Sequence, residues 1–211
     1  SDLAFGAIDS TGAVVISIEY TNSLTSVNNG RLGVQKNASW FYVDMKGQIV
    51  SDKYDRIGNF HQGYASVCLN KLWGAIDLQN RVVVPLEWQG VAPIVDPKLI
   101  WVKKDNLYYL YDGVQKSVRL KQGFANASNF DNEMAYVMSD GKWGIIDPDG
   151  KVLVPCLFEK EEDMVLAKQY MLAEDKKNLT EVEALRVIAR FDPDTNMFKI
   201  TSVIPDKHWD Y

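Results

Sequence analysis

The chain has 211 residues, of which 46% are hydrophobic and 24% are charged, and its net charge at pH 7 is −5. These values are ordinary for a globular protein, and the length is enough for one domain or two small ones. The scattered charges exclude nucleic acid and anionic membranes as main partners, because phosphate groups are bound by clustered Lys and Arg.

No apolar run approaches the roughly 18 residues of a membrane-spanning helix. The first residues, Ser1-Asp2-Leu3, contain neither the basic nor the apolar region of a signal peptide. Localisation is left open by the sequence: cell envelope or secreted if an upstream signal was removed, and otherwise cytoplasmic. Cys68 and Cys156 are predicted to be free, partly buried thiols, because a chain of this size does not need a disulfide.

A short motif recurs along the chain. Each copy has an apolar run that ends in Asp, then a turn, then a second apolar run. The Asp residues are spaced by 33 to 35 residues, and they are Asp9, Asp44, Asp77, Asp112 and Asp147. The copies predict repeat units near residues 4–37, 38–70, 71–105, 106–139 and 140–158, followed by a divergent C-terminal unit or cap at 159–211.

The turn in each copy has a physical explanation. The Asp carboxylate can accept hydrogen bonds from backbone N–H groups two or three residues on. The fourth position of the turn then needs a positive φ, which Gly adopts freely and Asn tolerates best among the other residues. The residues at this position are Gly12, Gly47, Asn80 and Gly150. Each motif is therefore predicted to be a β-hairpin, with Pro85 and Pro155 closing the second strand.

Further short strands are predicted downstream of each hairpin, for example Gly63-Tyr64-Ala65-Ser66-Val67, where apolar residues alternate. The fold predicted is all-β: a tandem array of about five to six units of about 35 residues that stack to bury a core. About 35 residues is short for a four-stranded blade, so an open, solenoid-like array of hairpins is favoured over a closed propeller-like ring. Residues 160–190 fit a helix or strands, and Leu185–Phe191 with Met197–Thr201 fits one more hairpin.

The Trp-Gly-x-Ile-Asp-x-x-Gly pattern resembles the WG-repeat, or KWG-repeat, family of bacterial proteins. The residues that carry it are Trp73-Gly74-Ala75-Ile76-Asp77 and Lys142-Trp143-Gly144-Ile145-Ile146-Asp147, with Phe5-Gly6-Ala7-Ile8-Asp9 as a close variant. The resemblance covers roughly residues 4 to 158 and implies an all-β repeat module. The family has no shared catalytic activity, so the resemblance transfers no catalytic residues.

Reactive groups are few. A pair formed by Cys68 and His61 would lie seven residues apart on a predicted strand and point to opposite faces. The segment Asp147-Pro148-Asp149-Gly150 resembles a calcium loop but lacks the later carboxylate ligand, which favours a turn. We therefore predict no catalytic residues, no metal and no cofactor.

Aromatic residues are the remaining binding candidates. Trp40, Trp73 and Trp143 occupy one repeat position, which favours packing between units. Trp88, Trp101 and Trp209 fall outside the motif and are predicted to be exposed recognition residues. The leading hypothesis is a non-enzymatic module for protein–protein interaction or scaffolding. The alternative is a lectin-like module that binds glycan or cell wall through exposed aromatics, and the third hypothesis is an enzyme whose site the sequence does not show.

Overall fold

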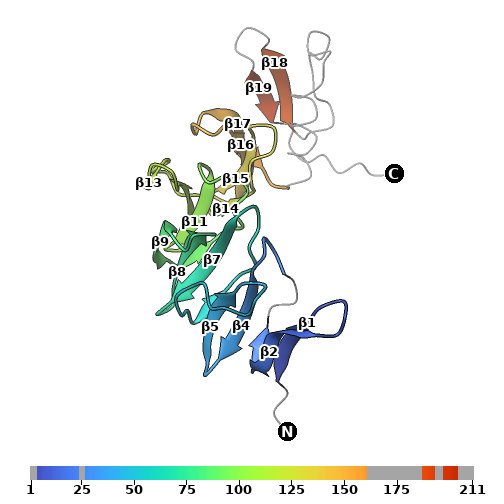
Figure 1. Cartoon of the computed structure of the whole chain (residues 1–211). Helices are drawn as coiled ribbons and strands as arrows, with labels where there is room; N and C mark the ends of the chain where they lie inside the picture. The colour runs from blue at the N-terminus through green and yellow to red at the C-terminus, as the bar shows by residue number, and fades with distance from the viewer. Residues whose placement is uncertain (1–3, 24–26, 161–186, 193–196, 204–211) are drawn as a thin grey trace, which may run out of the picture. The chain divides into compact units, whose positions relative to one another are not determined.

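The computed structural model describes residues 4–23, 27–160, 187–192 and 197–203, with side chains described up to residue 160. Every regular element in these ranges is a β-strand, and the strands form six separate antiparallel sheets (Figure 1). None of the described sheets closes on itself. The chain packs as two compact units, residues 1–122 and 123–211. The predicted all-β array of tandem repeats is confirmed.

The first compact unit contains four sheets. Its two-stranded sheet consists of β1 (Phe5–Ile8) and β2 (Val14–Tyr20). Its three-stranded sheet has the order β3 (Asn22–Ser23), β4 (Leu32–Lys36), β5 (Ser39–Val43). A four-stranded sheet follows with β6 (Arg56–Ile57), β7 (Tyr64–Leu69), β8 (Leu72–Asp77), β9 (Val82–Trp88). The last has the order β10 (Gly90–Val91), β11 (Ile100–Lys104), β12 (Leu107–Asp112), β13 (Ser117–Val118).

The second compact unit contains two sheets. Its four-stranded sheet has the order β14 (Asn126–Ala127), β15 (Ala135–Ser139), β16 (Lys142–Ile146), β17 (Val152–Phe158). A hairpin of β18 (Val187–Asp192) and β19 (Met197–Val203) matches the one predicted near the C-terminus. Most of the stretch in which helix and strand were left open, residues 161–186, lies outside the described residues. The division at residue 158 stays a prediction.

The boundaries between sheets do not coincide with the boundaries between sequence repeats: each sheet begins about half a period into a repeat. The predicted unit 71–105 contributes β8 and β9 to one sheet, and then β10 and β11 to the next. One period nevertheless provides four strands. They fit because the first strand of each four-stranded sheet has only two residues. A period of about 35 residues, short as it is for a four-stranded blade, is therefore enough for a four-stranded sheet.

The repeated Asp residues cap their turns as predicted, although in four of the turns the second N–H group lies four positions on instead of three. The Asp77 carboxylate accepts hydrogen bonds from the backbone N–H groups of Gln79 and Arg81, both at 2.9 Å. Asp9, Asp44 and Asp147 make the same pair of bonds, to the residues two and four positions on. Asn80 has a φ of 59°, and Gly12, Gly47 and Gly150 also have positive φ. One local geometry therefore explains the whole substitution pattern at this position.

Consecutive sheets of the first unit pack face to face, and their strands bury side chains on both faces. On β8, Ala75 packs in a cluster with Ile100 and Val102 of the following sheet. Its neighbour Ile76 packs with Tyr42 and Tyr54, which precede the β6–β9 sheet. Burial on both faces explains why the strands alternate poorly between apolar and polar residues.

In the β6–β9 sheet, a glycine in the third strand, β8, makes room for the edge strand β9. A Cβ atom at Gly74 would lie only 2.5 Å from the carbonyl oxygen of Val84, on β9. A Cβ atom at Gly6 or at Gly144 would likewise lie against a backbone carbonyl oxygen of the adjacent edge strand, β2 or β17. Pro85 lies within β9, and Pro155 lies within β17. Neither residue closes its strand, contrary to the prediction from the sequence. Both strands are edges of their sheets, where a missing N–H is tolerated.

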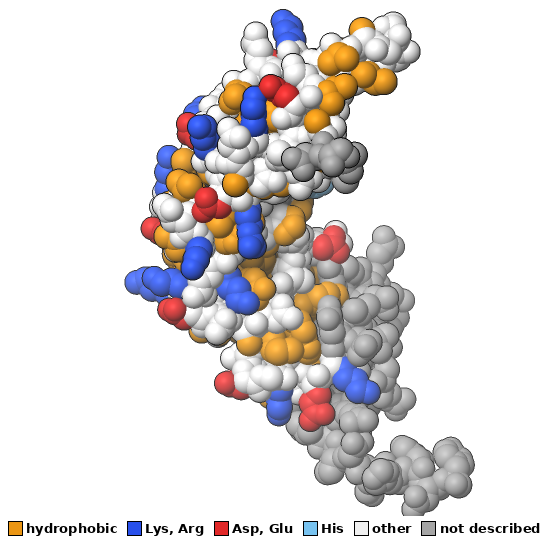
Figure 2. Space-filling model, turned by 90° about the horizontal axis from the view of Figure 1, so that it is seen from below, with side chains coloured by type: hydrophobic (Ala, Val, Ile, Leu, Met, Phe, Trp, Pro, Cys, Tyr) orange, Lys and Arg blue, Asp and Glu red, His pale blue; other side chains and the backbone are white. Residues whose placement is uncertain are grey.

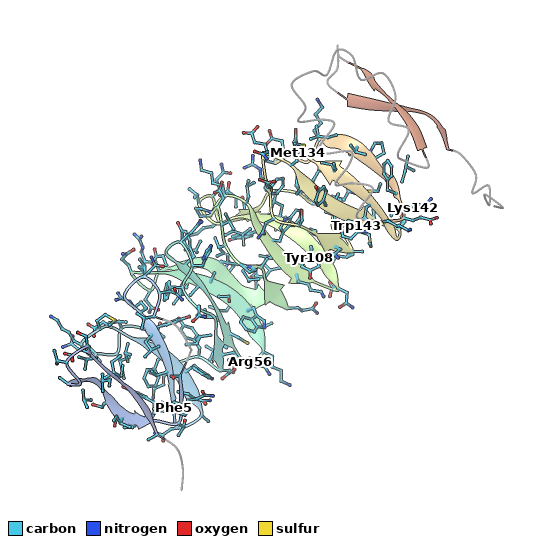
Figure 3. The ribbon with its side chains drawn as sticks, turned by 90° about the vertical axis from the view of Figure 1, so that its right-hand side faces the viewer. Phe5, Arg56, Tyr108, Met134, Lys142 and Trp143 are labelled. Atoms are coloured by element: carbon cyan, nitrogen blue, oxygen red, sulfur yellow. The ribbon has the colours of Figure 1, made fainter. Side chains whose placement is uncertain are left out.

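An aromatic side chain precedes this glycine position in every repeat, and Figure 3 labels three of them: Phe5, Tyr108 and Trp143. Trp73 lies opposite Trp88 in the strand register, and Trp143 lies opposite Phe158. These residues therefore pair with the edge strand of their own sheet. On the face shown in Figure 2, charged side chains of both signs are scattered among apolar ones, as expected from the sequence.

Candidate functional site

Two equivalent segments of successive repeats border a cleft in the first compact unit. Gly58 and Asn59 follow β6, and Ala92 and Pro93 follow β10, 34 residues later. The cleft between them has a volume of about 310 Å³. One side is lined by Gly58, Asn59, His61, Tyr64 and Ser66, and the other by residues 91–94. This volume lies at the lower end of the range for small-molecule sites.

The side that contains His61 is shaped by a tight turn. The backbone N–H of His61 donates to the carbonyl of Tyr64 at 2.8 Å, and the N–H of Tyr64 donates to His61 at 3.0 Å. Between them, Gln62 and Gly63 have φ angles of 48° and 87°, as in a two-residue hairpin turn. The turn is closed from both ends, so it holds the His61 and Tyr64 side chains at the edge of the cleft.

Close backbone packing holds Gly58 against β7. Its N–H donates to the carbonyl of Ser66 at 2.8 Å, and a Cβ atom here would lie 2.7 Å from the Ser66 hydroxyl oxygen. The Tyr42 hydroxyl, from the preceding sheet, donates to the Gly58 carbonyl. Burial raises the pKa of Tyr42, so this hydroxyl keeps its proton and remains a donor.

The floor of the cleft belongs to the core between the β6–β9 and β10–β13 sheets. Ile94 is buried, and Tyr64 and Val91 pack against the same apolar cluster, which contains Val84 and Trp88. Side chains packed in this way have little freedom to move. The floor of the site is therefore preformed, and ligand binding there would cost little ordering entropy in these residues.

Among the described residues that line the cleft, none is Lys, Arg, Asp or Glu. Its polar groups are the Asn59 amide, the His61 ring, the Tyr64 hydroxyl and the Ser66 hydroxyl. A phosphate or carboxylate ligand would meet no fixed cation there. The chemistry fits an apolar or neutral group that accepts or donates a few hydrogen bonds.

Cys68 does not line the cleft to which His61 contributes. It is buried on β7, and this burial raises the pKa of its thiol. The thiol is therefore protonated at neutral pH and is a poor nucleophile. Cys156, in the second unit, is also a free thiol. The prediction of two free thiols is confirmed.

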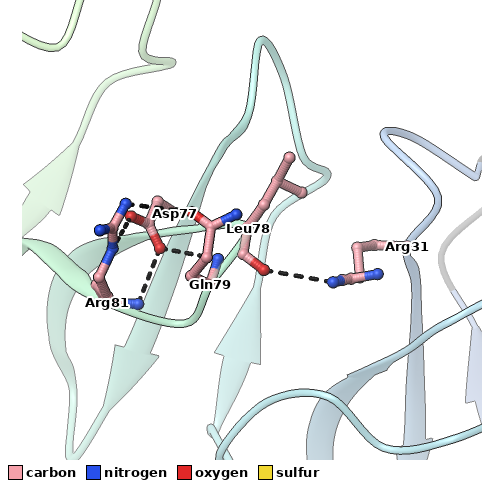
Figure 4. Close-up of polar contacts among 5 residues, drawn as sticks. All are labelled: Arg31, Asp77, Leu78, Gln79 and Arg81. Carbon is pink, nitrogen blue, oxygen red and sulfur yellow. Dashed lines mark hydrogen bonds and ion pairs between the residues drawn. The ribbon is translucent and has the colours of Figure 1, made fainter.

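A second contact between repeats lies beside the Asp77 turn (Figure 4). Arg31 donates from Nη2 to the carbonyl of Leu78 at 3.3 Å, and Arg81 donates from Nε to Asp77 Oδ2 at 2.7 Å. Asn80 donates to Asp52 Oδ2 at 3.1 Å, and Tyr54 donates to Asn80 Oδ1 at 3.4 Å. These groups satisfy one another, so this contact links two sheets and offers a ligand little.

The tryptophans predicted to be exposed are buried where the structure describes them. Trp88 is 5% exposed and Trp101 is 1% exposed, so the expectation of exposure is wrong for both, while Trp209 lies outside the described residues. Trp88 is in fact a repeat residue. A buried aromatic follows each turn Asp by ten to twelve residues: Tyr20, Tyr54, Trp88, Phe124 and Phe158. As binding residues the three tryptophans stay a prediction, which the burial of Trp88 and Trp101 does not support.

Sequence reasoning did not find the cleft. It considered His61 only as a partner of Cys68, and it gave no role to Asn59, Ser66 or residues 91–94. One signal was available: residues 57–60 and 91–94 are equivalent by the repeat period, yet Pro93 and Ile94 replace Asn59 and Phe60. A place where a repeat changes its residues is a reasonable place to look for specificity.

The Asp147 turn has a structural role. Asp147 Oδ1 accepts hydrogen bonds from the N–H groups of Asp149 and Lys151, at 3.0 and 2.8 Å. Within the part of the chain that the structure describes, no three His, Cys, Asp or Glu residues are grouped as metal ligands. In the same residues, no helix is long and apolar enough to cross a membrane.

Solved structures that match this chain have low similarity to it. A eukaryotic initiation factor is 13% identical, with a TM-score of 0.48, and the match covers 76% of this chain and 48% of that one. Hsv2p of Kluyveromyces lactis is 11% identical, with a TM-score of 0.38 and coverages of 62% and 48%. A protein of unknown function from Bacteroides caccae is 15% identical, with a TM-score of 0.32 and coverages of 72% and 74%. The chain thus spans about half the length of the first two structures.

No curated protein matches the sequence. The family model described as "WG containing repeat" matches residues 5–40, 40–73, 73–108 and 143–160, which together make up more than half of the chain. The matched segments have the phase of the sequence motif rather than that of the sheets. The chain belongs to the WG-containing repeat family.

Proposed function

We propose that this repeat module is non-enzymatic and binds a protein partner through the cleft between the β6–β9 and β10–β13 sheets. The observation that carries the proposal is a cleft with an apolar floor, formed by equivalent segments of two successive repeats and lined by no Lys, Arg, Asp or Glu among the described residues. Protein interfaces gain most of their energy where one anchor side chain fills such a pocket. A cleft of about 310 Å³ suits an aromatic or aliphatic anchor, with His61 and Tyr64 available for hydrogen bonds at its edge.

The test uses a displayed library of random linear peptides, selected against the full chain, with affinities measured by calorimetry. His61→Glu and Pro93→Arg each place a charge at the cleft, and both positions are exposed, so the fold should persist. Val114→Arg, at a position that is 62% exposed and outside the cleft lining, is the matched control. We expect each cleft variant to weaken selected peptides at least about tenfold, equivalent to about 1.4 kcal/mol, and the control to leave them unchanged.

Two outcomes would overturn the proposal. One is selection of peptides whose affinity neither cleft variant changes. The other is a glycan array in which the wild type binds sugars, and both cleft variants lose that binding while no peptide is selected. The second outcome would favour the glycan-binding alternative, for which the buried Trp88 and Trp101 provide no exposed stacking surface.

The non-enzymatic part of the proposal has its own test. His61 and Ser66 both line the cleft, but none of the described lining residues is a carboxylate that would orient His61 as a general base. We expect a fluorophosphonate probe, which labels activated serines, to leave the chain unmodified. Covalent labelling of Ser66 that His61→Ala abolishes would contradict this part alone.

A further inference from the structure

Two-residue turns with one backbone geometry occur at equivalent positions of three repeats. Each turn is closed by a pair of backbone hydrogen bonds, which join Asn28 with Arg31 at 3.0 and 2.9 Å, His61 with Tyr64 at 2.8 and 3.0 Å, and Asp131 with Met134 at 2.9 and 3.1 Å. The first turn residue has a positive φ in each case: 52° for Asn29, 48° for Gln62 and 50° for Asn132. These three residues are separated by 33 and 70 residues, which is one period and two periods.

The three turns differ in sequence, and the difference matters chemically. The turn residues are Asn29-Gly30, Gln62-Gly63 and Asn132-Glu133. When the backbone nitrogen of the following residue attacks the side-chain amide, Asn forms a five-membered ring, whereas the longer Gln must form a six-membered one. A following Glu places a side chain beside the attacking nitrogen, and a following Gly does not. Of these three turns, Asn29-Gly30 alone combines the short amide with an unhindered nitrogen.

The reacting groups of Asn29 and Gly30 are accessible. Both residues are exposed, and a Cβ atom at Gly30 would meet nothing within 4 Å. No described residue accepts a hydrogen bond from the Gly30 N–H. Asn29 Oδ1 accepts a hydrogen bond from the Gly63 N–H, which is long, at 3.4 Å. The side-chain amide is therefore held weakly, beside a backbone nitrogen that no hydrogen bond to a described residue restrains.

We propose that Asn29 is a site of spontaneous deamidation in the folded protein. The Gly30 backbone nitrogen attacks Asn29 Cγ, so that a bond from this nitrogen to Cγ forms. The bond from Cγ to the side-chain nitrogen breaks, and ammonia leaves with the proton of the Gly30 amide. Water then opens the resulting cyclic imide at one of its carbonyl groups and yields aspartate or isoaspartate, each with a negative charge where Asn29 was neutral. This inference does not depend on the function proposed for the cleft.

The two products change the turn differently. Aspartate keeps the backbone and still offers an oxygen to the Gly63 N–H. Isoaspartate carries the chain through its Cβ and Cγ, which adds a methylene group to the backbone between Asn28 and Arg31, so the hydrogen bonds that close the turn lose their register. Arg31 donates to the carbonyl of Leu78, in the turn between β8 and β9, at 3.3 Å (Figure 4). Isoaspartate therefore weakens a contact between two sheets that aspartate leaves in place.

The experiment incubates the full chain at neutral pH and maps its peptides by mass spectrometry. Digestion in heavy-oxygen water marks any residue modified during handling, because ring opening takes its oxygen from the solvent. Isoaspartate is detected separately, by enzymatic methylation with isoaspartyl methyltransferase. The control variants follow from the repeat: Asn29→Gln reproduces the 62–63 turn, and Gly30→Glu reproduces the 132–133 turn. Glu133→Gly makes the opposite change and gives that turn the Asn-Gly sequence.

We expect Asn29 to become a mixture of aspartate and isoaspartate, while Gln62 and Asn132 stay intact over the same time. Asn29→Gln and Gly30→Glu should each abolish modification of the first turn. Glu133→Gly should make Asn132 a second site, because it removes the side chain beside the attacking nitrogen.

Thermal unfolding compares the two products. Anion exchange separates the chains that have gained a negative charge, and this fraction contains isoaspartate. It should unfold at a lower temperature than Asn29→Asp, which reproduces the aspartate product alone. Asn29→Asp should unfold with the wild type. A charge-shifted fraction as stable as Asn29→Asp would overturn the difference proposed between the two products.

Three results would overturn the site itself. The first is an Asn29 that stays intact in the folded chain and is modified only in urea, because the turn would then protect it. The second is equal modification of Gln62 or Asn132, because the Asn-Gly pair would then not determine the site. The third is modification of Asn29 that Gly30→Glu does not slow, because the Gly30 nitrogen would then not be the attacking group.

Discussion

The β6–β9 and β10–β13 sheets have the same strand order and differ mainly at the edge. In the first, β9 has seven residues and pairs with β8. In the second, the equivalent β13 has two residues. The third strand has Gly74 in one sheet and Tyr109 at the same position in the other. A side chain at this position fills the space that the edge strand needs, and the glycine therefore determines how long the edge strand stays paired.

Glycine has a different role in the β10–β13 sheet. Gly113 follows the turn Asp, and a Cβ atom there would lie 2.6 Å from Val83 Cγ1 on the preceding sheet. Its N–H donates to the Pro97 carbonyl at 2.8 Å. One sheet thus uses a glycine for contact within the sheet, and the other uses one for contact between sheets. The repeat keeps its strand order while the position of closest backbone approach changes.

Substitution of Gly74 should have the largest effect. Gly74→Val forces a side chain against the Val84 carbonyl and is expected to reduce the free energy of unfolding by about 3 kcal/mol. Tyr109→Phe at the equivalent position should cost less than about 1 kcal/mol. Urea unfolding followed by tryptophan fluorescence measures both. A Gly74→Val variant as stable as the wild type would show that the glycine does not determine edge-strand pairing.

Substitution of the turn Asp residues should have the second-largest effect on stability. Asp77→Ala removes the acceptor for two backbone N–H groups and for Arg81, with an expected loss of about 2 kcal/mol. Asp112 accepts hydrogen bonds from Val114 and Gln115, both at 2.9 Å, but its ion pair with Arg119 is longer, at 3.6 Å. Arg119→Ala should therefore cost less than Arg81→Ala. The reverse order in thermal unfolding would contradict this ranking.

The Asp77 contribution should depend on pH. Burial raises the pKa of Asp77, but the hydrogen bonds from Arg81 and Gln79 outweigh it, so the pKa lies below its ordinary value of 3.8. A lowered pKa means that the stabilisation is fully present above the unfolded-state value and is lost as pH falls through the folded-state value. The stability difference between wild type and Asp77→Asn should therefore be constant near neutral pH and shrink below about pH 3.8. A difference that stayed constant in acid would exclude this linkage.

Trp88→Phe should have a smaller effect. Phe occupies the equivalent position at Phe124 and Phe158, and the Trp88 indole N–H is buried without a described hydrogen-bond partner. The loss of packing volume is partly offset by removal of an unsatisfied donor, so the expected cost is below about 1 kcal/mol. Trp88→Ala should cost about 4 kcal/mol. If Trp88→Phe and Trp88→Ala lost similar amounts of stability, the indole would be making a contact specific to this repeat.

The smallest effects should have opposite signs in the two sheets. Lys116 has a φ of 55° in the β10–β13 turn, so Lys116→Gly relieves strain and should stabilise by about 0.5 kcal/mol. Asn80→Gly keeps the backbone geometry but removes the hydrogen bonds to Asp52 and Tyr54, and should destabilise by about 0.5 kcal/mol. Differential scanning calorimetry can resolve the two signs, and a shared sign would contradict the proposed roles.

The features predicted correctly from the sequence are local ones. The role of the Asp turn and the positive φ of Asn80 depend on a few consecutive residues, so the pattern contains the necessary information. The burial of Trp88 was missed because the spacing from the turn to this aromatic varies by two residues. The cleft was missed because it requires two segments one period apart to face each other, which no single repeat reveals.

The half-period offset between motif and sheet has a consequence for how such chains vary in length. Each sheet joins strands from two successive sequence repeats, so no repeat is a self-contained building block. Loss of one whole period, such as residues 71–105, would place β12 directly after β7, where it could pair as β8 does. An in-phase duplication or deletion in the gene would therefore leave a full set of strands for a sheet at the junction.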